Sequence, residues 1–262
     1  MKQITPLTGH IYERYIYKST FLNKMQRNVS KNDRIRGIVI PTTISEDLAY
    51  LCGIFAGDGS IGYRRKKNEY SLKVVGNPKD EKEFYHQVIG PKFEKVFGIF
   101  PRMRYHDSQT TYGFSIYSKT IYLFLVNNIG LPSGVKYSTL KIPEIFLKEH
   151  KLAVAFVRGV FDTDGCICFK KEDRKYANYP NISLASKSES FIREISDFLW
   201  TTGLKFSKPY RYKQTDSRFK AGYSITYRLE INGHKNLKLW NERIGFYNPK
   251  HLEKIRRFSN NV

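Results

Sequence analysis

Two apolar runs in the chain share one design. The first, "LCGIFAGDGS" (51–60), and the second, "VRGVFDTDGC" (157–166), align without a gap, and each run ends at an aspartate. The aspartates, Asp58 and Asp164, lie 106 residues apart (58 and 164). The first run is hydrophobic on nearly every side from Leu48 to Gly57, which predicts a buried helix, and Ser45 is placed to cap its N-terminus.

A similar order of elements follows each run. Alternating polar and apolar residues in "SIGYRRK" (60–66) and "CICFKK" (166–171) predict a strand, and a second strand and an amphipathic helix come next. Two basic strands and a closing helix complete each copy. The chain is therefore predicted to be an α+β protein of two αββαββα halves, 45–147 and 148–262, preceded by an N-terminal extension, 1–44. Helices should cover one face of each antiparallel sheet and leave the other face free and basic.

The net charge of the chain indicates what the free sheet faces could bind. The 262 residues include 45 Lys and Arg against 24 Asp and Glu, a net charge of +21. Hydrophobic residues at 40% exclude a wholly disordered chain, and the scattered basic residues indicate a folded surface for a polyanion such as nucleic acid. A basic ribosomal-type protein is the alternative. No apolar run approaches the ~20 residues of a membrane span, and "MKQITPLTGH" lacks a signal peptide's apolar segment, so an intracellular protein is expected, in the cytoplasm or an organelle.

The glycines of the two runs predict how their helices pack. Gly53 and Gly57 lie four residues apart, as Gly159 and Thr163 do in the second run, so one side of each helix lacks bulk. If the helices pair in parallel, the two aspartates meet at their C-terminal ends. Like charges there are costly without a cation, and hard oxygen ligands favour Mg²⁺. The alternative is an ordinary acidic residue before a glycine cap. The three cysteines, Cys52, Cys166 and Cys168, are interpreted as small packing residues.

Both runs resemble the LAGLIDADG motif, and residues 45 to 262 resemble a two-repeat LAGLIDADG homing endonuclease. The resemblance implies a monomer whose motif helices pack at the centre and whose two sheets form a DNA-binding saddle. It also implies Mg²⁺-dependent cleavage of both strands of a long, nearly asymmetric target in intron homing. Cleavage would cross the minor groove and leave short 3′ overhangs. Mn²⁺ is expected to substitute for Mg²⁺, and Ca²⁺ to support binding without cleavage.

The resemblance also assigns site residues. Asp58 and Asp164 are the metal ligands it implies, assisted by the backbone carbonyls of Gly57 and Thr163. Lysines near the end of each half, Lys136 and Lys250, are candidates to stand by the scissile phosphates. Asn77 and Lys187, at the ends of equivalent second strands, are further candidates to hold the water network.

Two departures from the motif are informative. Its sixth position is Ala56 in one copy and Asp162 in the other, so that position is not required for chemistry in both sites, and Asp162 is expected to form a cap or a salt bridge. Arg158, at the second position, implies a helix that is less buried on that side.

The alternation of the strands predicts which side chains face DNA, where some would read base edges and others would hold phosphates. The candidates are Ser60, Arg64, Lys66, Ser71, Lys73, Arg102, Arg104 and Ser115 in the first half, and Lys170, Asn181, Ser183, Arg211, Lys213, Ser224, Thr226 and Arg228 in the second.

Other functions fit parts of the pattern. LAGLIDADG proteins include maturases that help an intron RNA fold, and non-cleaving DNA-binding regulators. Retention of both acids disfavours a regulator and is compatible with a maturase. A purely architectural DNA binder would gain nothing from paired acids. An intein is disfavoured because the chain opens with Met1 and ends "SNNV", without the nucleophile and the His-Asn pair that splicing needs. A free-standing endonuclease is therefore expected.

Overall fold

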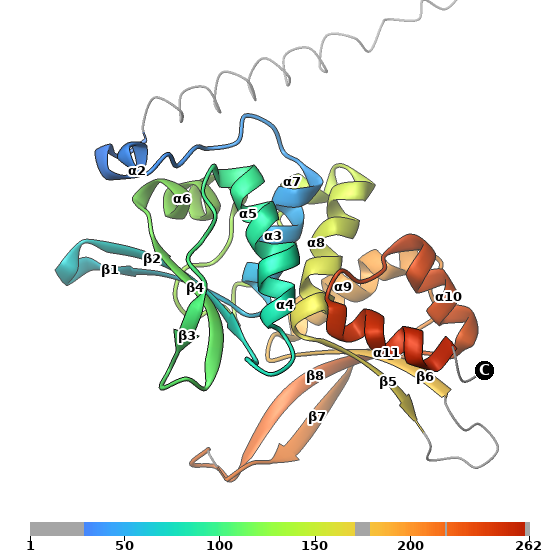
Figure 1. The fold of residues 1–262 in the computed structure, drawn as a ribbon. Helices are drawn as coiled ribbons and strands as arrows, with labels where there is room; N and C mark the ends of the chain where they lie inside the picture. Colours follow the sequence, from blue (N-terminus) through green and yellow to red (C-terminus); the bar gives the residue numbers. More distant parts are fainter. Residues whose placement is uncertain (1–28, 171–178, 218, 260–262) are drawn as a thin grey trace, which may run out of the picture.

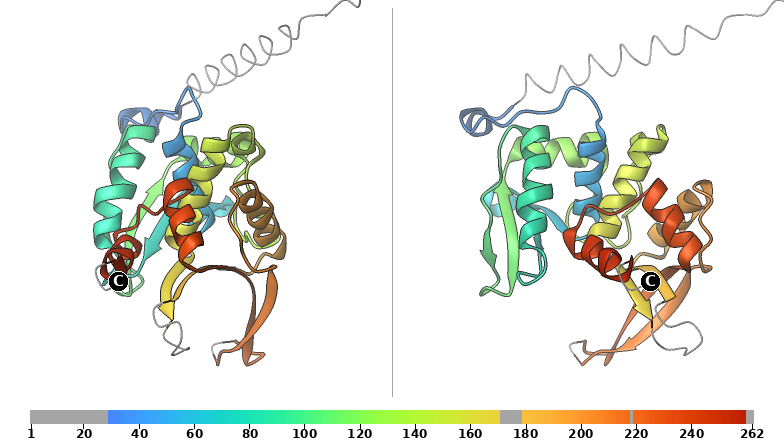
Figure 2. Two further views of the ribbon diagram at one scale, coloured as in Figure 1. Left: turned by 90° about the vertical axis from the view of Figure 1, so that its right-hand side faces the viewer. Right: turned by 45° about the vertical axis from the view of Figure 1, so that its right-hand side comes forward.

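The computed structural model describes residues 29–170, 179–217 and 219–259. Two similar sets of helices and strands lie side by side, with the helices on one side and both sheets on the other (Figures 1 and 2). Within the described ranges, no helix combines the length and the apolar character needed to cross a bilayer.

The first set follows a short helix, α2 (Lys31–Ile35). Its elements are α3 (Glu46–Ala56), β1 (Gly59–Arg64), the 3-10 turn η1 (Arg65–Lys67), β2 (Glu69–Gly76), α4 (Lys82–Phe84), the π-helix η2 (Tyr85–Ile89), α5 (Gly90–Phe97), β3 (Arg104–His106), β4 (Thr111–Tyr117), α6 (Lys119–Leu123), the π-helix η3 (Phe124–Ile129) and α7 (Glu144–Leu147). Ser45 accepts the N–H of Leu48 and caps α3 as predicted.

The second set repeats this order and adds a helix. Its elements are α8 (His150–Thr163), β5 (Gly165–Lys170), β6 (Tyr179–Ser186), α9 (Glu189–Thr201), β7 (Tyr210–Thr215), β8 (Tyr223–Asn232), α10 (His234–Arg243) and α11 (Pro249–Ser259). The last helix, α11, was not predicted from the sequence. It lies against β5 and reaches α4 of the first set.

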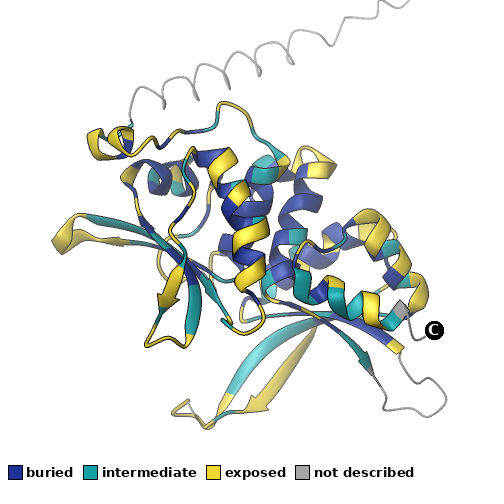
Figure 3. Cartoon of the chain, viewed as in Figure 1, coloured by how far each residue is buried: buried dark blue, intermediate teal, exposed yellow. Residues whose placement is uncertain are grey.

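Each set forms one antiparallel sheet with the same strand order, β1-β2-β4-β3 in the first and β5-β6-β8-β7 in the second. One face of each sheet packs its apolar side chains against the helices, as the pairs Leu72–Ile116 and Leu184–Leu229 show. The opposite face is largely open, and burial decreases towards the strand ends (Figure 3). This confirms the predicted α+β class with two αββαββα halves.

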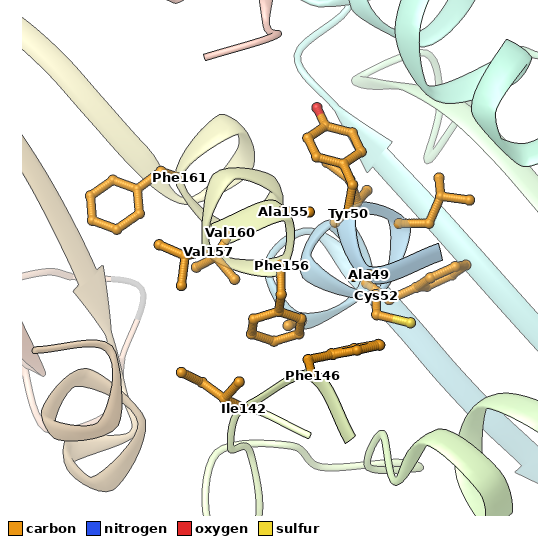
Figure 4. Close-up of a cluster of buried hydrophobic side chains, with 14 of the residues drawn as sticks. Ala49, Tyr50, Cys52, Ile142, Phe146, Ala155, Phe156, Val157, Val160 and Phe161 are labelled. Atoms are coloured by element: carbon orange, nitrogen blue, oxygen red, sulfur yellow. The ribbon is translucent and has the colours of Figure 1, made fainter. Parts of the chain in front are cut away.

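The two motif helices, α3 and α8, lie side by side in the middle of the molecule (Figure 1) and pack against each other through buried side chains (Figure 4). A Cβ atom on Gly53 would stand 2.1 Å from the Phe156 carbonyl oxygen, and one on Gly159 would stand 2.3 Å from that of Tyr50. No larger residue fits at either position without moving a backbone. The missing side chains predicted this close approach, and dispersion contacts between the two backbones and their flanking aromatic rings stabilise it.

Three expectations for individual residues were wrong. Arg102 precedes β3 and Lys66 lies in the turn η1, so neither belongs to a strand, because β3 begins later and β1 ends sooner than the basic pattern suggests. Cys166 is exposed on the open face of β5 rather than packed inside, whereas Cys52 is fully buried.

Candidate functional site

The C-terminal ends of α3 and α8 bring the two motif aspartates to one place. Asp58 directly follows Gly57, the C-cap of α3, and Asp164 is itself the C-cap of α8. A Cβ atom on Gly57 would lie 2.0 Å from Oγ1 of Thr163 and 3.5 Å from Cγ of Asp164. The helix ends therefore meet, and the glycine in the first copy makes room for the threonine in the second.

Both carboxyl groups are held where their charge is disfavoured. Burial raises the pKa of Asp58 to about 7, with further contributions from the negative charges of Asp164 and Glu81. Asp164 remains open to solvent on one side, yet the surrounding protein desolvates its carboxyl and raises its pKa to about 6. Two adjacent acids with raised pKa values indicate a site where burial disfavours the charged form of both carboxyl groups.

The donor set suits a hard divalent cation. Two carboxylates facing each other supply oxygen ligands, and a cation between them would relieve the repulsion that raises the pKa of Asp58. Across the described residues, no group of three or more His, Cys, Asp or Glu side chains could hold a metal ion.

Two lysines, one from each repeat, lie at this acidic centre. Lys136, in the loop after η3, donates from Nζ to the carbonyl oxygens of Gly57 and Gly59, and burial lowers its pKa. Lys250, in the first turn of α11, forms an ion pair of 2.5 Å with Glu81. The charges of both lysines act on Asp58, so the structure brings these two candidates to the carboxylates.

The other two residues predicted to assist catalysis, Asn77 and Lys187, make contacts away from the two aspartates. Asn77 is an exposed turn residue, whose Oδ1 accepts the N–H of Lys79 and whose Nδ2 donates to Asp80. Lys187 is exposed, with its ammonium 5.1 Å from the ring centre of Tyr137. Neither side chain has a contact with Asp58 or Asp164 among these interactions.

Sequence reasoning missed Glu81. It is 5% exposed, and its Oε2 accepts the backbone N–H of Asn77 at 2.8 Å. In the sequence it stands within "KDEKE" before an amphipathic helix, where acidic residues are common because they favour the helix N-terminus. Nothing in that pattern distinguishes Glu81 from its neighbours.

Asp162 has a structural role near the site. It is fully buried, its carboxylate accepts the hydroxyl of Tyr50 at 2.7 Å, and it also accepts the N–H groups of Tyr247 and Asn248 just before α11. Asp162 was expected to form a cap or a salt bridge. Its acceptance of backbone N–H groups just before α11 is closer to a cap, although the capped segment lies far from Asp162 in sequence. Arg158 is half-buried, as predicted, and its guanidinium lies 4.2 Å from the ring centre of Tyr247.

Comparisons with known proteins agree with this fold. Residues 151–245 match the family model described as a LAGLIDADG-like domain. The homing endonuclease I-DmoI in complex with DNA and Ca superposes with a TM-score of 0.54 at 18% identity, over 81% of this chain and 96% of that one. The chain has the two-repeat LAGLIDADG fold. I-WcaI bound to its DNA recognition sequence shares this fold, with a TM-score of 0.52 at 12% identity, over 96% of this chain and 94% of that one.

The sequence relatives are longer proteins, of which this chain matches only a part. A DNA polymerase of Thermococcus litoralis is 28% identical over 198 residues, which are 75% of this chain and 10% of the polymerase. An uncharacterized protein of Methanocaldococcus jannaschii is 22% identical over 182 residues, which are 68% of this chain and 62% of that protein. The chain thus spans less than two thirds of the length of these two relatives.

The strand register of the first LAGLIDADG repeat places six DNA-contact candidates on one face. Ser60, Lys73 and Ser115 stand opposite one another across β1, β2 and β4. The same face holds Arg64, Ser71 and Arg104. Two of the cations already have partners on this surface, since Lys73 pairs with Asp107 at 2.8 Å and Arg64 pairs with Glu69.

The second LAGLIDADG repeat agrees with the expectation only in part. Ser183, Ser224, Thr226 and Arg228 share the open face, and the Arg228 guanidinium lies 3.6 Å from the ring centre of Tyr212. Lys170 is the last residue of β5 and pairs with Tyr179, but its side chain lies outside the described part of the chain.

Three expectations for this second face need correction. Arg211 and Lys213 stand opposite Tyr227 and Ile225, so they lie on the other face of the sheet. All of β7 is exposed, and a strand without a buried side gives the sequence no pattern that fixes its register. Asn181 does lie on the open face, but it is only 3% exposed and its amide donates to Asn232 at 2.7 Å, which leaves little of it to read bases.

Proposed function

We propose that this chain is a site-specific DNA endonuclease of the LAGLIDADG type that hydrolyses both strands of a long, nearly asymmetric duplex with Mg²⁺. The observation that carries the proposal is the meeting of Asp58 and Asp164 between two sheets with open faces, where the first sheet presents Arg64, Lys73 and Arg104 and the second presents Arg228. A net charge of +21 supports a polyanionic substrate. The fold shared with I-DmoI and I-WcaI, both solved with DNA, supports DNA as that polyanion.

Asp58 and Asp164, with the backbone carbonyl of Thr163, would hold the metal. The carbonyl of Gly57, the other expected ligand, already accepts the Lys136 ammonium, which would have to move before that oxygen could bind a metal. Bound Mg²⁺ supplies a more acidic water and stabilises charge on the phosphate and leaving oxygens. Because the ligands must be deprotonated, the pKa of about 7 at Asp58 means that metal binding should weaken as pH falls below neutral, where protons compete with the metal.

The chain's own cations complete the proposed site. Lys136 and Lys250 place positive charge where negative charge develops on the attacked phosphate, which lowers the barrier. Cations on the open sheet faces hold flanking phosphates, and polar side chains between them read bases. The same proposal includes cleavage across the minor groove with short 3′ overhangs. It also includes action as a monomer and an intracellular location.

A cleavage selection tests this function. The protein is incubated with a randomised or genomic DNA library and Mg²⁺, and the cut ends are sequenced. We expect one family of long target sites with staggered 3′ ends, and no cutting in EDTA. Cleavage that persists in EDTA would contradict the metal site. Binding of one long site by a protein that never cuts it would indicate the non-cleaving regulator instead.

A further inference from the structure

One ion pair joins the two repeats beside the acidic centre. Glu81, just before α4, and Lys250, in α11, are 169 residues apart in sequence, and their charged atoms lie 2.5 Å apart. The side chain of Glu81 is 7% exposed and that of Lys250 is 26% exposed. The charges of both residues act on Asp58, with opposite sign. Burying a carboxylate this deeply is costly unless the carboxylate is paired, which raises the question of what the pair does in the site.

The first repeat builds a closely fitted place for this carboxylate. Oε1 of Glu81 binds Lys250, while Oε2 accepts the N–H of Asn77 at 2.8 Å. Gly76 leaves the necessary space, since a Cβ atom there would stand 2.0 Å from Oε2 of Glu81 and 3.2 Å from the Tyr85 hydroxyl oxygen. Glu81 is therefore held in one position before any DNA binds.

The second repeat fixes the lysine in a similar way. The N–H of Lys250 donates to Oδ1 of Asn248 at 3.0 Å, and the side chain of Asn248 donates to the carbonyl of Asp162 at 2.8 Å. A continuous series of bonds thus runs from the end of α8 through Asn248 and Lys250 to Glu81. The Lys250 side chain therefore extends from the second repeat to Glu81 of the first repeat.

The other lysine is held differently. Lys136 binds two neutral backbone carbonyls, those of Gly57 and Gly59, and its charge is the one that acts on Asp164. Lys250 instead depends on a charged partner, which fixes its direction more strongly because a charge-assisted bond is roughly twice as strong as a neutral one. The two halves of the centre are therefore unequal.

We propose that Glu81 is a positioning residue that fixes the Lys250 ammonium beside Asp58, so that cleavage of one DNA strand depends on Glu81 and cleavage of the other does not. This inference rests on the proposed endonuclease function. Glu81 is not expected to touch the DNA or a metal, since both of its carboxylate oxygens already have partners.

The first experiment does not require cleavage. NMR of the lysine ammonium groups of the metal-free, ¹⁵N-labelled protein should show a slowly exchanging signal for Lys250, assigned by its loss in Lys250→Met. That signal should disappear in Glu81→Gln and persist in Glu194→Gln, a matched control whose carboxylate accepts the N–H of Ile142 at 2.8 Å. Persistence in Glu81→Gln would overturn the positioning role whatever the protein's activity.

The second experiment follows each strand of an end-labelled target in single-turnover cleavage. Glu81→Gln should slow one strand by about 10- to 100-fold, the range expected when a catalytic group is displaced by about 1 Å. The same strand should be slowed by Lys250→Met, and the double variant should be no slower than Lys250→Met alone. The affinity for DNA in Ca²⁺ should be unchanged or tighter, because a negative charge is removed.

A second variant guards against misfolding. Gly76→Ala retains every charge and displaces chiefly the Glu81 carboxylate, with a shift of a few tenths of an ångström at the Tyr85 hydroxyl, so it should slow the same strand. Equal slowing of both strands, or additive losses in the double variant, would overturn the proposal. A wild-type protein that cuts neither strand would instead overturn the endonuclease function, while the ammonium signals would still test Glu81.

Discussion

The two LAGLIDADG repeats have one backbone plan and two different ways of closing the site. In the first repeat, the loop after η3 lies along β1, where the N–H of Gly134 donates to the Ile61 carbonyl at 2.8 Å. In the second, helix α11 takes this place, and Lys254 donates to the equivalent carbonyl of Ile167 at 3.2 Å. The backbone is nearly symmetric, but the charges around the two aspartates are not.

The sixth motif position contributes to this difference. Ala56 is a buried apolar residue, whereas Asp162 binds the chain just before α11 and so determines where that helix begins. The second repeat can therefore send Lys250 across to Glu81, while Lys136 of the first repeat stays on the backbone of its own motif. Unequal surroundings lead us to expect unequal contributions from paired residues, except for the contribution of the two aspartates to cleavage.

The aspartates should show the largest effect and the most equal one. Asp58→Asn and Asp164→Asn should each reduce double-strand cleavage at least about 10³-fold, since each removes a charged ligand. Binding in Ca²⁺ should change little, because loss of a carboxylate relieves repulsion. Quenched single-turnover assays and titrations measure the two quantities, with exposed Asp197→Asn as the control. Full cutting by either variant would rule out the shared metal site.

The lysines should show the next largest effect, and the asymmetry between the repeats should appear in which DNA strand each lysine variant slows. Lys136→Met and Lys250→Met should each lower the cleavage rate about 100-fold while leaving affinity nearly unchanged, as for loss of a group that stabilises the transition state. Exposed Lys151→Met, on α8, is the control. A loss confined to affinity and restored at low salt would make these lysines ordinary phosphate contacts.

The pH dependence of stability gives a smaller effect, larger for Asp58 than for Asp164. The folded pKa of Asp58, about 7, lies above its unfolded value of about 4, so the folded protein binds more protons between these values. Folding stability should therefore fall as pH rises from about 4 to 7, and the cost is complete above pH 7. In EDTA at pH 8, Asp58→Asn should raise Tm by roughly 3–6 °C, with little change at pH 4.

Calorimetry of both asparagine variants checks this order. Asp164→Asn should give a smaller rise in Tm, because its folded pKa is about 6 and its carboxyl is open to solvent. A larger rise for Asp164→Asn would reverse the comparison between the repeats.

The sheet faces should give the smallest effect for any single residue. Arg228→Ala should weaken DNA binding by about 1–3 kcal/mol if it contacts a base, whereas Arg211→Ala, on the opposite face, should change it less. Replacing Arg64, Arg104 and Arg228 together should lower the salt dependence of binding by about three phosphate contacts. Replacement of three lysines within residues 1–44 serves as the comparison. If it weakens DNA binding more than the three arginine replacements do, the DNA binds a surface other than the open sheet faces.

The sequence alone determined the repeated fold, the close packing of the motif helices and the meeting of Asp58 with Asp164. These features follow from local periodicity and from glycines where backbones touch, and both are visible in the chain because burial on one side imposes them. The register of β1, β2 and β4 was predictable for the same reason. Helix α11 was missed because it lies beyond the second motif's predicted plan and carries many charges.

Only the tertiary structure decided the rest. The Glu81–Lys250 pair and the bonds from Asp162 to Tyr247 and Asn248 join residues more than 80 positions apart, and such contacts leave no periodic signal. The face of Arg211 and Lys213 was also decided there. The sequence of β7 alternates tyrosine with Arg211 and Lys213, but neither side of the strand is buried, so this alternation does not fix a face and pairing with β8 alone sets the register.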